Sequence, residues 1–83
     1  METLENLIMN GSFILKKKDI KSHNLDAEIL LAKVLKKNRE YLVTNLKMKI
    51  DKENVKKYKD LIKRRQEKEP IAYIIKQKDF RNM

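Results

Sequence analysis

A near-absence of the residues that interrupt helices constrains this chain more than any other feature. Its 83 residues contain one glycine and one proline, Gly11 and Pro70, while 40% are charged. Glycine and proline most often end helices and form tight turns, so their scarcity favours helices joined by short connections. A chain of this length makes one small domain with a modest core. We therefore predict an all-α fold, a small bundle of about five helices, two of them short, with no sheet.

Hydrophobic residues recur at helical spacing along most of the chain and mark the expected helices. Side chains that can accept hydrogen bonds from free backbone N–H groups stand at three of the starts, at Thr3, Asn38 and Asp51. Proline is tolerated at the first position of a helix, so Pro70 predicts a break followed by a last short helix. The predicted helices run from about Thr3 to Lys17, from Ser22 or Asn24 to Lys37, from Arg39 to Asn45, from Asp51 to the break at Glu69, and from Ile71 to about Lys76.

Gly11 and the three tyrosines are interior residues of special interest. Gly11 lies inside the first predicted helix, where glycine costs up to about 1 kcal/mol relative to alanine. It either permits close approach of another helix or simply weakens its own. Tyr41, Tyr58 and Tyr73 fall at inward-facing positions of three different predicted helices. We therefore expect these tyrosines to pack in the core rather than to stack on nucleic-acid bases.

The net charge of +9 is concentrated in one part of the chain. Residues 33–68 contain fourteen Lys and Arg against five Asp and Glu, and the remainder is balanced. Such a segment can attract nucleic acid or an acidic partner. Lysine outnumbers arginine seventeen to four, however, which favours an ordinary solvated helix face over a binding surface. If the segment does bind a partner, the candidate residues are Lys63, Arg64 and Arg65, and the alternative role of Arg64 is an intrahelical pair with Asp60.

Residue types that carry catalysis or bind metals and cofactors are nearly missing. The chain has no cysteine, and one glycine cannot form a phosphate-binding loop. We expect His23 to be an ordinary surface histidine and interpret its combination with Ser12 or Ser22 as chance. Asp26 and Glu28 lie two residues apart on a helix, so their carboxylates do not converge. We therefore predict no catalytic, cofactor-binding or metal-binding residue in this chain.

Hydropathy and the N-terminal residues bear on the compartment. No apolar run approaches the roughly 18–20 residues that a membrane-spanning helix needs. The first residues are acidic, unlike the start of a secretory signal. We therefore expect a cytoplasmic protein that has no membrane partner.

Two segments of the chain together resemble the signatures of a known family. Residues 25–31 read LDAEILL, and residues 64–74 read RRQEKEPIAYI, with Lys-Asp-Phe following at 78–80. The first motif alone is weak, but the pair at this distance is fairly specific and resembles the release-factor glutamine methyltransferases known as PrmC or HemK. The resemblance covers essentially the whole chain. One departure is Lys68, because the family usually has glycine there, where a left-handed residue can end the fourth helix.

The resemblance implies that residues 1–77 are the helical N-terminal domain of such an enzyme and that residues 78–83 begin a linker to a methyltransferase domain that the chain lacks. Family members transfer a methyl group from S-adenosylmethionine to the glutamine of the Gly-Gly-Gln motif in class-1 peptide-chain release factors. The helical domain is then expected to help bind and position the release factor beside the adjoining methyltransferase domain. The family's Asn-Pro-Pro-Tyr motif and glycine-rich cofactor loop have no counterpart here, so the chain alone is expected to be inactive.

Two other functions stay open as alternatives. The chain can be a stand-alone basic helical protein that binds nucleic acid or the ribosome, but only its charge supports this, so nucleic acid is the less favoured partner. It can also be purely structural, packing against a catalytic neighbour and stabilising it.

Overall fold

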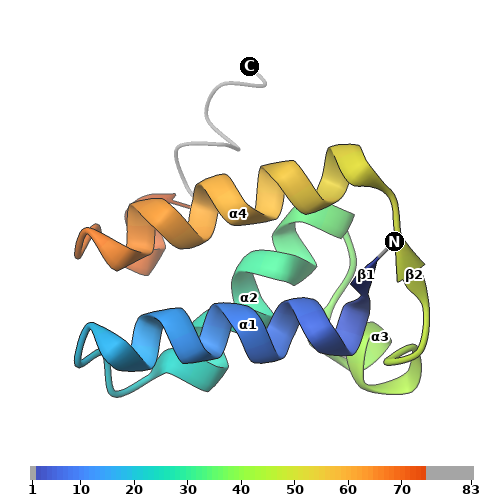
Figure 1. Cartoon of the computed structure of the whole chain (residues 1–83), viewed down its shortest axis with the longest axis horizontal. Helices are drawn as coiled ribbons and strands as arrows, with labels where there is room; N and C mark the ends of the chain where they lie inside the picture. Colours follow the sequence, from blue (N-terminus) through green and yellow to red (C-terminus); the bar gives the residue numbers. More distant parts are fainter. Residues whose placement is uncertain (1, 75–83) are drawn as a thin grey trace.

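Helices make up most of the molecule, as the scarcity of glycine and proline predicts. The structure is a computed structural model that describes residues 2–74. The predicted all-α fold is confirmed, while the predicted end of the last helix and the linker at residues 78–83 lie outside the described residues. In chain order the elements are β1 (Glu2–Thr3), α1 (Leu4–Lys17), α2 (His23–Leu35), α3 (Arg39–Thr44), β2 (Lys49–Ile50), α4 (Lys52–Gln66) and a last helical turn over residues 71–74 (Figure 1).

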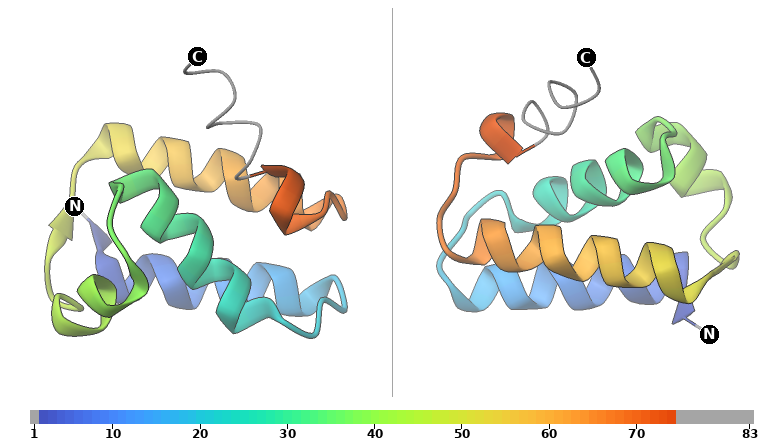
Figure 2. Two further views of the ribbon diagram at one scale, coloured as in Figure 1. Left: turned by 180° about the vertical axis from the view of Figure 1, so that it is seen from behind. Right: turned by 90° about the horizontal axis from the view of Figure 1, so that it is seen from above.

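The helices α1 and α4 lie side by side and run in the same direction, and α2 crosses behind them (Figures 1 and 2). The short helix α3 closes the end of the bundle at which α1 and α4 begin. The turn over residues 71–74 lies on the same side as α2, behind the face that α1 and α4 present together (Figure 2). That α1–α4 face is therefore left uncovered by the last described part of the chain.

Gly11 allows α4 to lie against α1. A Cβ atom added at Gly11 would overlap the hydroxyl of Tyr58 and come within 2.9 Å of Ile62 Cδ1. Tyr58 is fully buried, and its hydroxyl donates a hydrogen bond of 3.1 Å to the carbonyl of Ala27 in α2. Gly11 therefore permits close approach, which was one of its two open roles, and the space it leaves is filled by a side chain that joins three helices.

A two-residue antiparallel pair fastens the N-terminus, and the sequence analysis did not anticipate it. Glu2 pairs with Ile50, and Thr3 pairs with Lys49. The pairing continues into α1, whose first N–H groups have no partner inside the helix. Those groups are bound from outside, by Leu4 donating to the Met48 carbonyl at 2.8 Å, Glu5 to the Leu46 carbonyl at 3.0 Å, and Asn6 to Thr3 Oγ1 at 3.2 Å. The predicted cap at Thr3 is thus confirmed and extended.

Three helices end in a left-handed residue, and none of these residues is glycine. They are Asp19 after α1, Lys36 after α2 and Lys68 after α4, with φ angles of 63°, 60° and 74°. The next N–H group in each case reaches five residues back, as in a Schellman motif. These bonds run from Ile20 to Leu15 at 3.2 Å, from Lys37 to Ala32 at 3.0 Å and from Glu69 to Arg64 at 3.3 Å. Lysine at position 68 therefore keeps the backbone geometry that glycine would adopt freely.

The three tyrosines, all predicted to face inward, differ in burial. Tyr58 is in the core, and Tyr41 packs against the core with its hydroxyl 3.4 Å from Met48 Sδ. The prediction is wrong for Tyr73, which is 54% exposed. Its neighbour Ile74 fills the core position instead, and adjacent residues on a helix face different directions.

Candidate partner-binding surface

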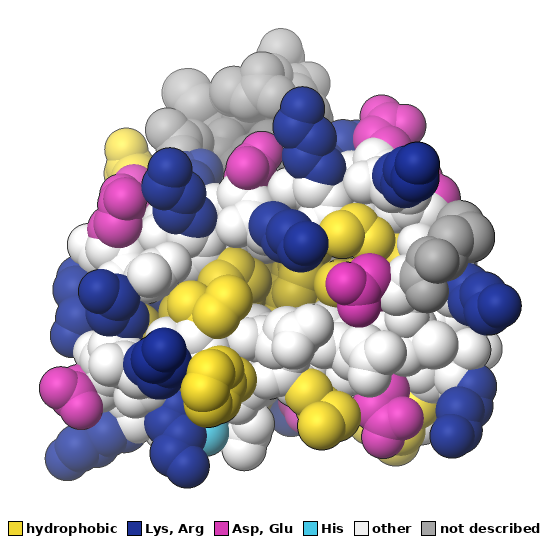
Figure 3. Space-filling model, viewed as in Figure 1, with side chains coloured by type: hydrophobic (Ala, Val, Ile, Leu, Met, Phe, Trp, Pro, Cys, Tyr) yellow, Lys and Arg dark blue, Asp and Glu magenta, His cyan; other side chains and the backbone are white. Residues whose placement is uncertain are grey.

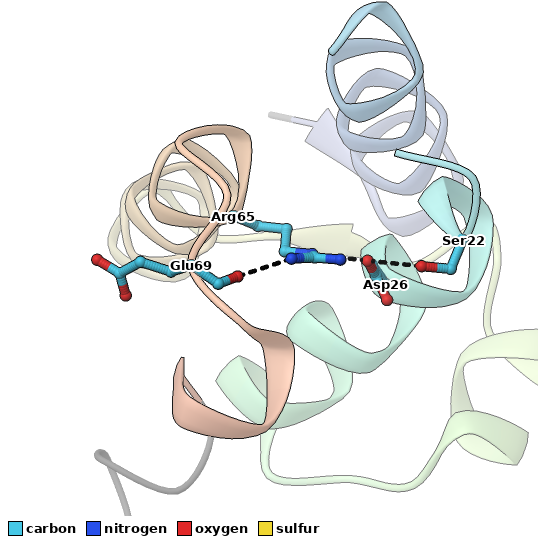
Figure 4. Close-up of polar contacts among 4 residues, drawn as sticks. All are labelled: Ser22, Asp26, Arg65 and Glu69. Carbon is cyan, nitrogen blue, oxygen red and sulfur yellow. Dashed lines mark hydrogen bonds and ion pairs between the residues drawn. The ribbon is translucent and has the colours of Figure 1, made fainter. Parts of the chain in front are cut away.

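A buried ion pair joins the first turn of α2 to the last turn of α4. Arg65 Nε donates to Asp26 Oδ2 at 2.8 Å, and its Nη1 donates to the Glu69 carbonyl at 2.7 Å (Figure 4). The Asp26 and Arg65 side chains are only 3% and 18% exposed. Ser22, predicted to cap α2 with its side chain, instead donates from Oγ to Asp26 Oδ2 at 3.0 Å. The two segments that carried the family resemblance therefore meet in one polar cluster.

Arg64 binds the same turn from its other side. Its Nε donates to Glu69 Oε1 at 3.0 Å, and its Nη2 lies 2.9 Å from the same oxygen. Arg64 and Arg65 thus hold residue 69 by its carboxylate and by its carbonyl, directly before Pro70. Both arginines were candidates for partner binding, and the structure places both in contacts within the domain.

Lys63, the third candidate, belongs to a different arrangement. It is exposed, and it continues a row of exposed lysines on α4 at positions 52, 56, 59 and 63. Spacings of four, three and four residues place these side chains along one face of a helix. Within residues 2–74, none of the four ammonium groups forms an ion pair. We call these four residues the lysine stripe.

The lysine stripe borders a hollow between α1 and α4. This hollow, of about 300 Å³, is lined from α1 by Leu7, Asn10, Gly11 and Ile14, and from α4 by Tyr58, Ile62, Gln66 and the stripe residues Lys59 and Lys63. Hydrophobic side chains gather between the two helices, with basic and acidic side chains around them (Figure 3).

A second hollow, of about 630 Å³, shares Lys59 and extends toward the start of α4 past Ile50 and Val55. A third, of about 310 Å³, shares Ile14 and reaches the exposed side chain of Phe13 at the other end. Neighbouring hollows share lining residues, so the three follow one another along α4. We call the three hollows together the α1–α4 groove.

Ser12 and His23 do lie within hydrogen-bonding distance, although the sequence analysis treated their combination as chance. Ser12 Oγ is 2.7 Å from His23 Nδ1 and donates its proton to Asn24 Oδ1 at 2.5 Å. A hydroxyl has one proton to donate, so His23 Nδ1 must be the donor in its own bond to Ser12. A histidine that donates to the serine cannot act as its general base. The contact therefore ties the start of α2 to α1.

Glu28 and Tyr58 also make contacts within the domain. Glu28 and Asp26 hold different arginines, because Glu28 Oε1 accepts from Arg39 Nη2 at 2.9 Å. Burial, and secondarily the charge of Glu28, raise the pKa of the Tyr58 hydroxyl far above its ordinary value of 10.0.

Within residues 2–74, no cluster of three or more His, Asp or Glu side chains is arranged to hold a metal ion. In the same range, no helix is both long and apolar enough to cross a membrane.

Neither the lysine stripe nor the groove was predicted from the sequence. The stripe has a signal in the sequence, since lysines at positions 52, 56, 59 and 63 follow helical periodicity. The groove has no such signal in the sequence, because its apolar lining residues follow the same pattern as residues of the hydrophobic core. Gly11 lines the central hollow at the point where Tyr58 and Ile62 of α4 approach α1.

Comparison with known proteins places the chain in a family. The family described as the PrmC N-terminal domain matches residues 6–75. A release factor glutamine methyltransferase from Clostridium botulinum is 43% identical over 77 residues, which cover 93% of this chain and 27% of that protein. A protein of the same description from Leptospira interrogans is 37% identical over 81 residues, which cover 98% of this chain and 28% of the relative.

A bifunctional methyltransferase from Rickettsia felis is 37% identical over 78 residues, which cover 94% of this chain and 15% of that protein. No solved structure gives a significant match. The chain spans only 27% and 28% of the two release factor glutamine methyltransferases described above. The family match includes both segments that meet at the Asp26–Arg65 pair. The predicted resemblance is confirmed, and the chain belongs to the PrmC N-terminal domain family of the release factor glutamine methyltransferases.

Proposed function

We propose that this chain helps to bind a class-1 peptide-chain release factor and to position it for methylation. In this proposal residues 1–77 form the helical domain, and residues 78–83 lead toward a methyltransferase domain. That domain would bind S-adenosylmethionine and methylate the glutamine of the Gly-Gly-Gln motif. No residue of this chain takes part in the methyl transfer, and the chain alone neither binds S-adenosylmethionine nor methylates.

Family membership supports the identity of the partner, and one structural observation supports the positioning role. The lysine stripe is exposed, makes no ion pair within residues 2–74, and borders an apolar groove. Of the three candidate residues for contact, Lys63 lies on this surface, whereas Arg64 and Arg65 hold the turn at Glu69. We therefore propose Lys63 as a direct contact with the release factor. Arg64 would lie at the edge of the contact surface, and Arg65 would contribute only by fixing the turn at Glu69.

Positioning can accelerate a reaction without any contact with the reacting atoms. A substrate held in the correct orientation reacts as if it were highly concentrated, and this lowers the activation free energy by several kcal/mol. A release factor bound at two places would present its glutamine to the methyltransferase domain in one orientation. The helical domain would supply one of those two places.

A chimaera tests the proposal. The 77-residue segment of the Clostridium botulinum relative that aligns with this chain is replaced by this chain, and a second version lacks the segment. We expect the chimaera to methylate an intact release factor with nearly the KM of the parent enzyme, and the shortened version to show a much higher KM. Equal kcat/KM values for the two would rule out a positioning role. A shortened enzyme that keeps its KM but unfolds at lower temperature would favour the purely structural role.

Nucleic-acid binding is the competing function, and the lysine stripe also gives it some support. Affinity of this chain for RNA or DNA would fall steeply with salt, because each neutralised phosphate releases counterions. Failure to bind either nucleic acid at low salt would eliminate this alternative.

A further inference from the structure

The lysine stripe and the groove have matching lengths. The helix α4 has 15 residues, which at 1.5 Å per residue gives a length of about 22 Å. The stripe runs from the first residue of α4 to its last turn, and the groove accompanies it throughout. A helical segment of about 15 residues, or four turns, would fill such a groove.

The chemistry of the groove defines one side of its occupant. The lining of its central hollow includes the apolar side chains of Leu7, Ile14 and Ile62. An occupant therefore needs an apolar stripe, such as that of an amphipathic helix. The border is cationic at Lys59 and Lys63, so the flank of that helix should be acidic. Glu2 and Asp60 also line the wider hollow, and they would repel carboxylates there. The carboxylates of the occupant should therefore lie toward the Lys63 end of the groove.

Charge argues against occupants from this chain itself. A second copy carries the same net charge of +9, so two copies repel each other. Residues 75–83 contain Lys76, Lys78 and Arg81 against Asp79, so that segment is basic as well. A nucleic acid would satisfy the lysines, but it would leave the apolar floor without a matching surface, because most protein contacts to nucleic acids are made to phosphate and sugar.

We propose that the α1–α4 groove binds an acidic amphipathic helix of a partner protein, with apolar side chains on the groove floor and carboxylates on the lysine stripe. The proposal rests on the proposed function only for the identity of that partner, the release factor. The surface, the length and the acidic character of the helix follow from the groove itself. The last helical turn does not cover the groove, because it lies on the α2 side of the molecule (Figure 2).

The direct test uses isotope-labelled chain and a designed peptide of about 15 residues. The peptide contains leucine at helical spacing and glutamate on one flank, and a scrambled peptide of the same composition serves as its control. We expect the designed peptide to shift the amide signals of Gly11, Ile62 and Lys63, and the scrambled peptide to leave them unchanged. Shifts confined to other parts of the chain would overturn the proposal.

Matched charge reversals sharpen the test. The double variant Lys59→Glu/Lys63→Glu removes the cationic border beside the central hollow, whereas Lys21→Glu/Lys47→Glu changes the net charge equally at exposed residues that line none of the hollows described above. We expect the first variant to bind the designed peptide about tenfold or more weakly, and the second to bind it nearly as the unmodified chain does. Equal weakening in both would mean that only the overall charge matters, and would overturn the proposal. Unchanged amide spectra away from the substitutions check that each variant folds.

Two further measurements separate this inference from the proposed function. If an intact release factor binds the chain and the Lys59→Glu/Lys63→Glu variant binds it equally well, the proposed function stands and the groove proposal fails. If the designed peptide binds the groove but no release factor binds the chain, the groove proposal stands and the release factor is not its partner. Single-stranded RNA that shifts the same amides and displaces the peptide would assign the surface to nucleic acid instead.

Discussion

Asp26 and Arg65 are 39 residues apart in the chain, and their side chains meet at 2.8 Å in the interior of the molecule. The pair joins α2 to the end of α4, where the chain leaves α4 and leads to the last helical turn. It also joins the two distant sequence segments on which the family resemblance rests. Ser22 donates a further hydrogen bond to Asp26, and Arg65 donates a further one to the Glu69 carbonyl.

Breaking this pair should cost much more stability than breaking a surface pair. Removing one partner of a buried ion pair leaves an uncompensated charge, at a cost of about 3–5 kcal/mol when burial is complete. Because Arg65 keeps some exposure, we expect Arg65→Met to lower the free energy of unfolding by about 2–4 kcal/mol. Urea denaturation followed by circular dichroism measures the change.

The exposed Glu28–Arg39 pair provides the control for that prediction. Arg39→Met removes a partner from a salt bridge of the same type at the surface, and surface pairs are worth about 1 kcal/mol or less. Equal losses in the Arg39 and Arg65 variants would show that the Asp26–Arg65 pair has no special structural weight.

Gly11→Ala should destabilise the fold even though alanine favours helices. The added Cβ would overlap the Tyr58 hydroxyl, and overpacking of this kind costs about 1–3 kcal/mol. The higher helix propensity of alanine offsets up to about 1 kcal/mol of this cost, so we expect a net loss of stability. In a Tyr58→Phe background the overlap with the hydroxyl is gone, and Gly11→Ala should therefore cost less. A double-mutant cycle from urea unfolding measures the coupling. Additive losses would mean that Gly11 and Tyr58 do not constrain each other.

Lys68→Gly should stabilise the chain. Lys68 has a φ angle of 74°, and a left-handed conformation costs a residue with a side chain roughly 1–2 kcal/mol. Glycine avoids that cost but loses more entropy on folding, so we expect a net gain of about 0.5–1 kcal/mol. Thermal unfolding measures the gain, and Lys68→Ala is the control because it removes the charge while keeping the Cβ atom. A gain of the same size in both variants would assign the effect to charge.

Stability should fall at alkaline pH because of Tyr58. Burial raises the pKa of its hydroxyl in the folded chain above the unfolded value of 10.0. The folded state therefore retains a proton that the unfolded state releases, so the contribution of Tyr58 is complete below pH 10.0 and decreases above it. The slope for one such group is at most about 1.4 kcal/mol per pH unit. Urea unfolding at several alkaline pH values should show a steeper decline for the unmodified chain than for Tyr58→Phe. Parallel curves would contradict the assignment to Tyr58.

The helices could be predicted from the sequence because their signals are local. Thr3, Asn38 and Asp51 each stand at the start of a helix, and cap preferences depend on the few residues that follow. Even here the sequence did not reveal every bond, since the Asp51 side chain accepts from Asn54 Nδ2 rather than from a backbone N–H group.

The lysine stripe was missed although its spacing is local, but the other missed features depend on contacts between distant residues. The pairing of Thr3 with Lys49 involves two residues on each side, too few for a periodic pattern. The central hollow of the groove is lined by residues of both α1 and α4, and the role of Arg65 depends on a partner 39 residues away. Spacing along one helix predicts neighbours on that helix, but it does not say which other helix lies opposite.

The central claim is that the lysine stripe and groove position a release factor, and a comparison of two substrates tests it most directly. In the chimaera with the Clostridium botulinum relative, Lys59→Glu/Lys63→Glu is assayed with an intact release factor and with a short peptide that contains only the Gly-Gly-Gln loop. We predict that kcat/KM falls about tenfold or more for the intact factor and stays unchanged for the peptide, which is too short to reach the groove. Unchanged kcat/KM for the intact factor, or an equal fall for both substrates, would contradict the claim.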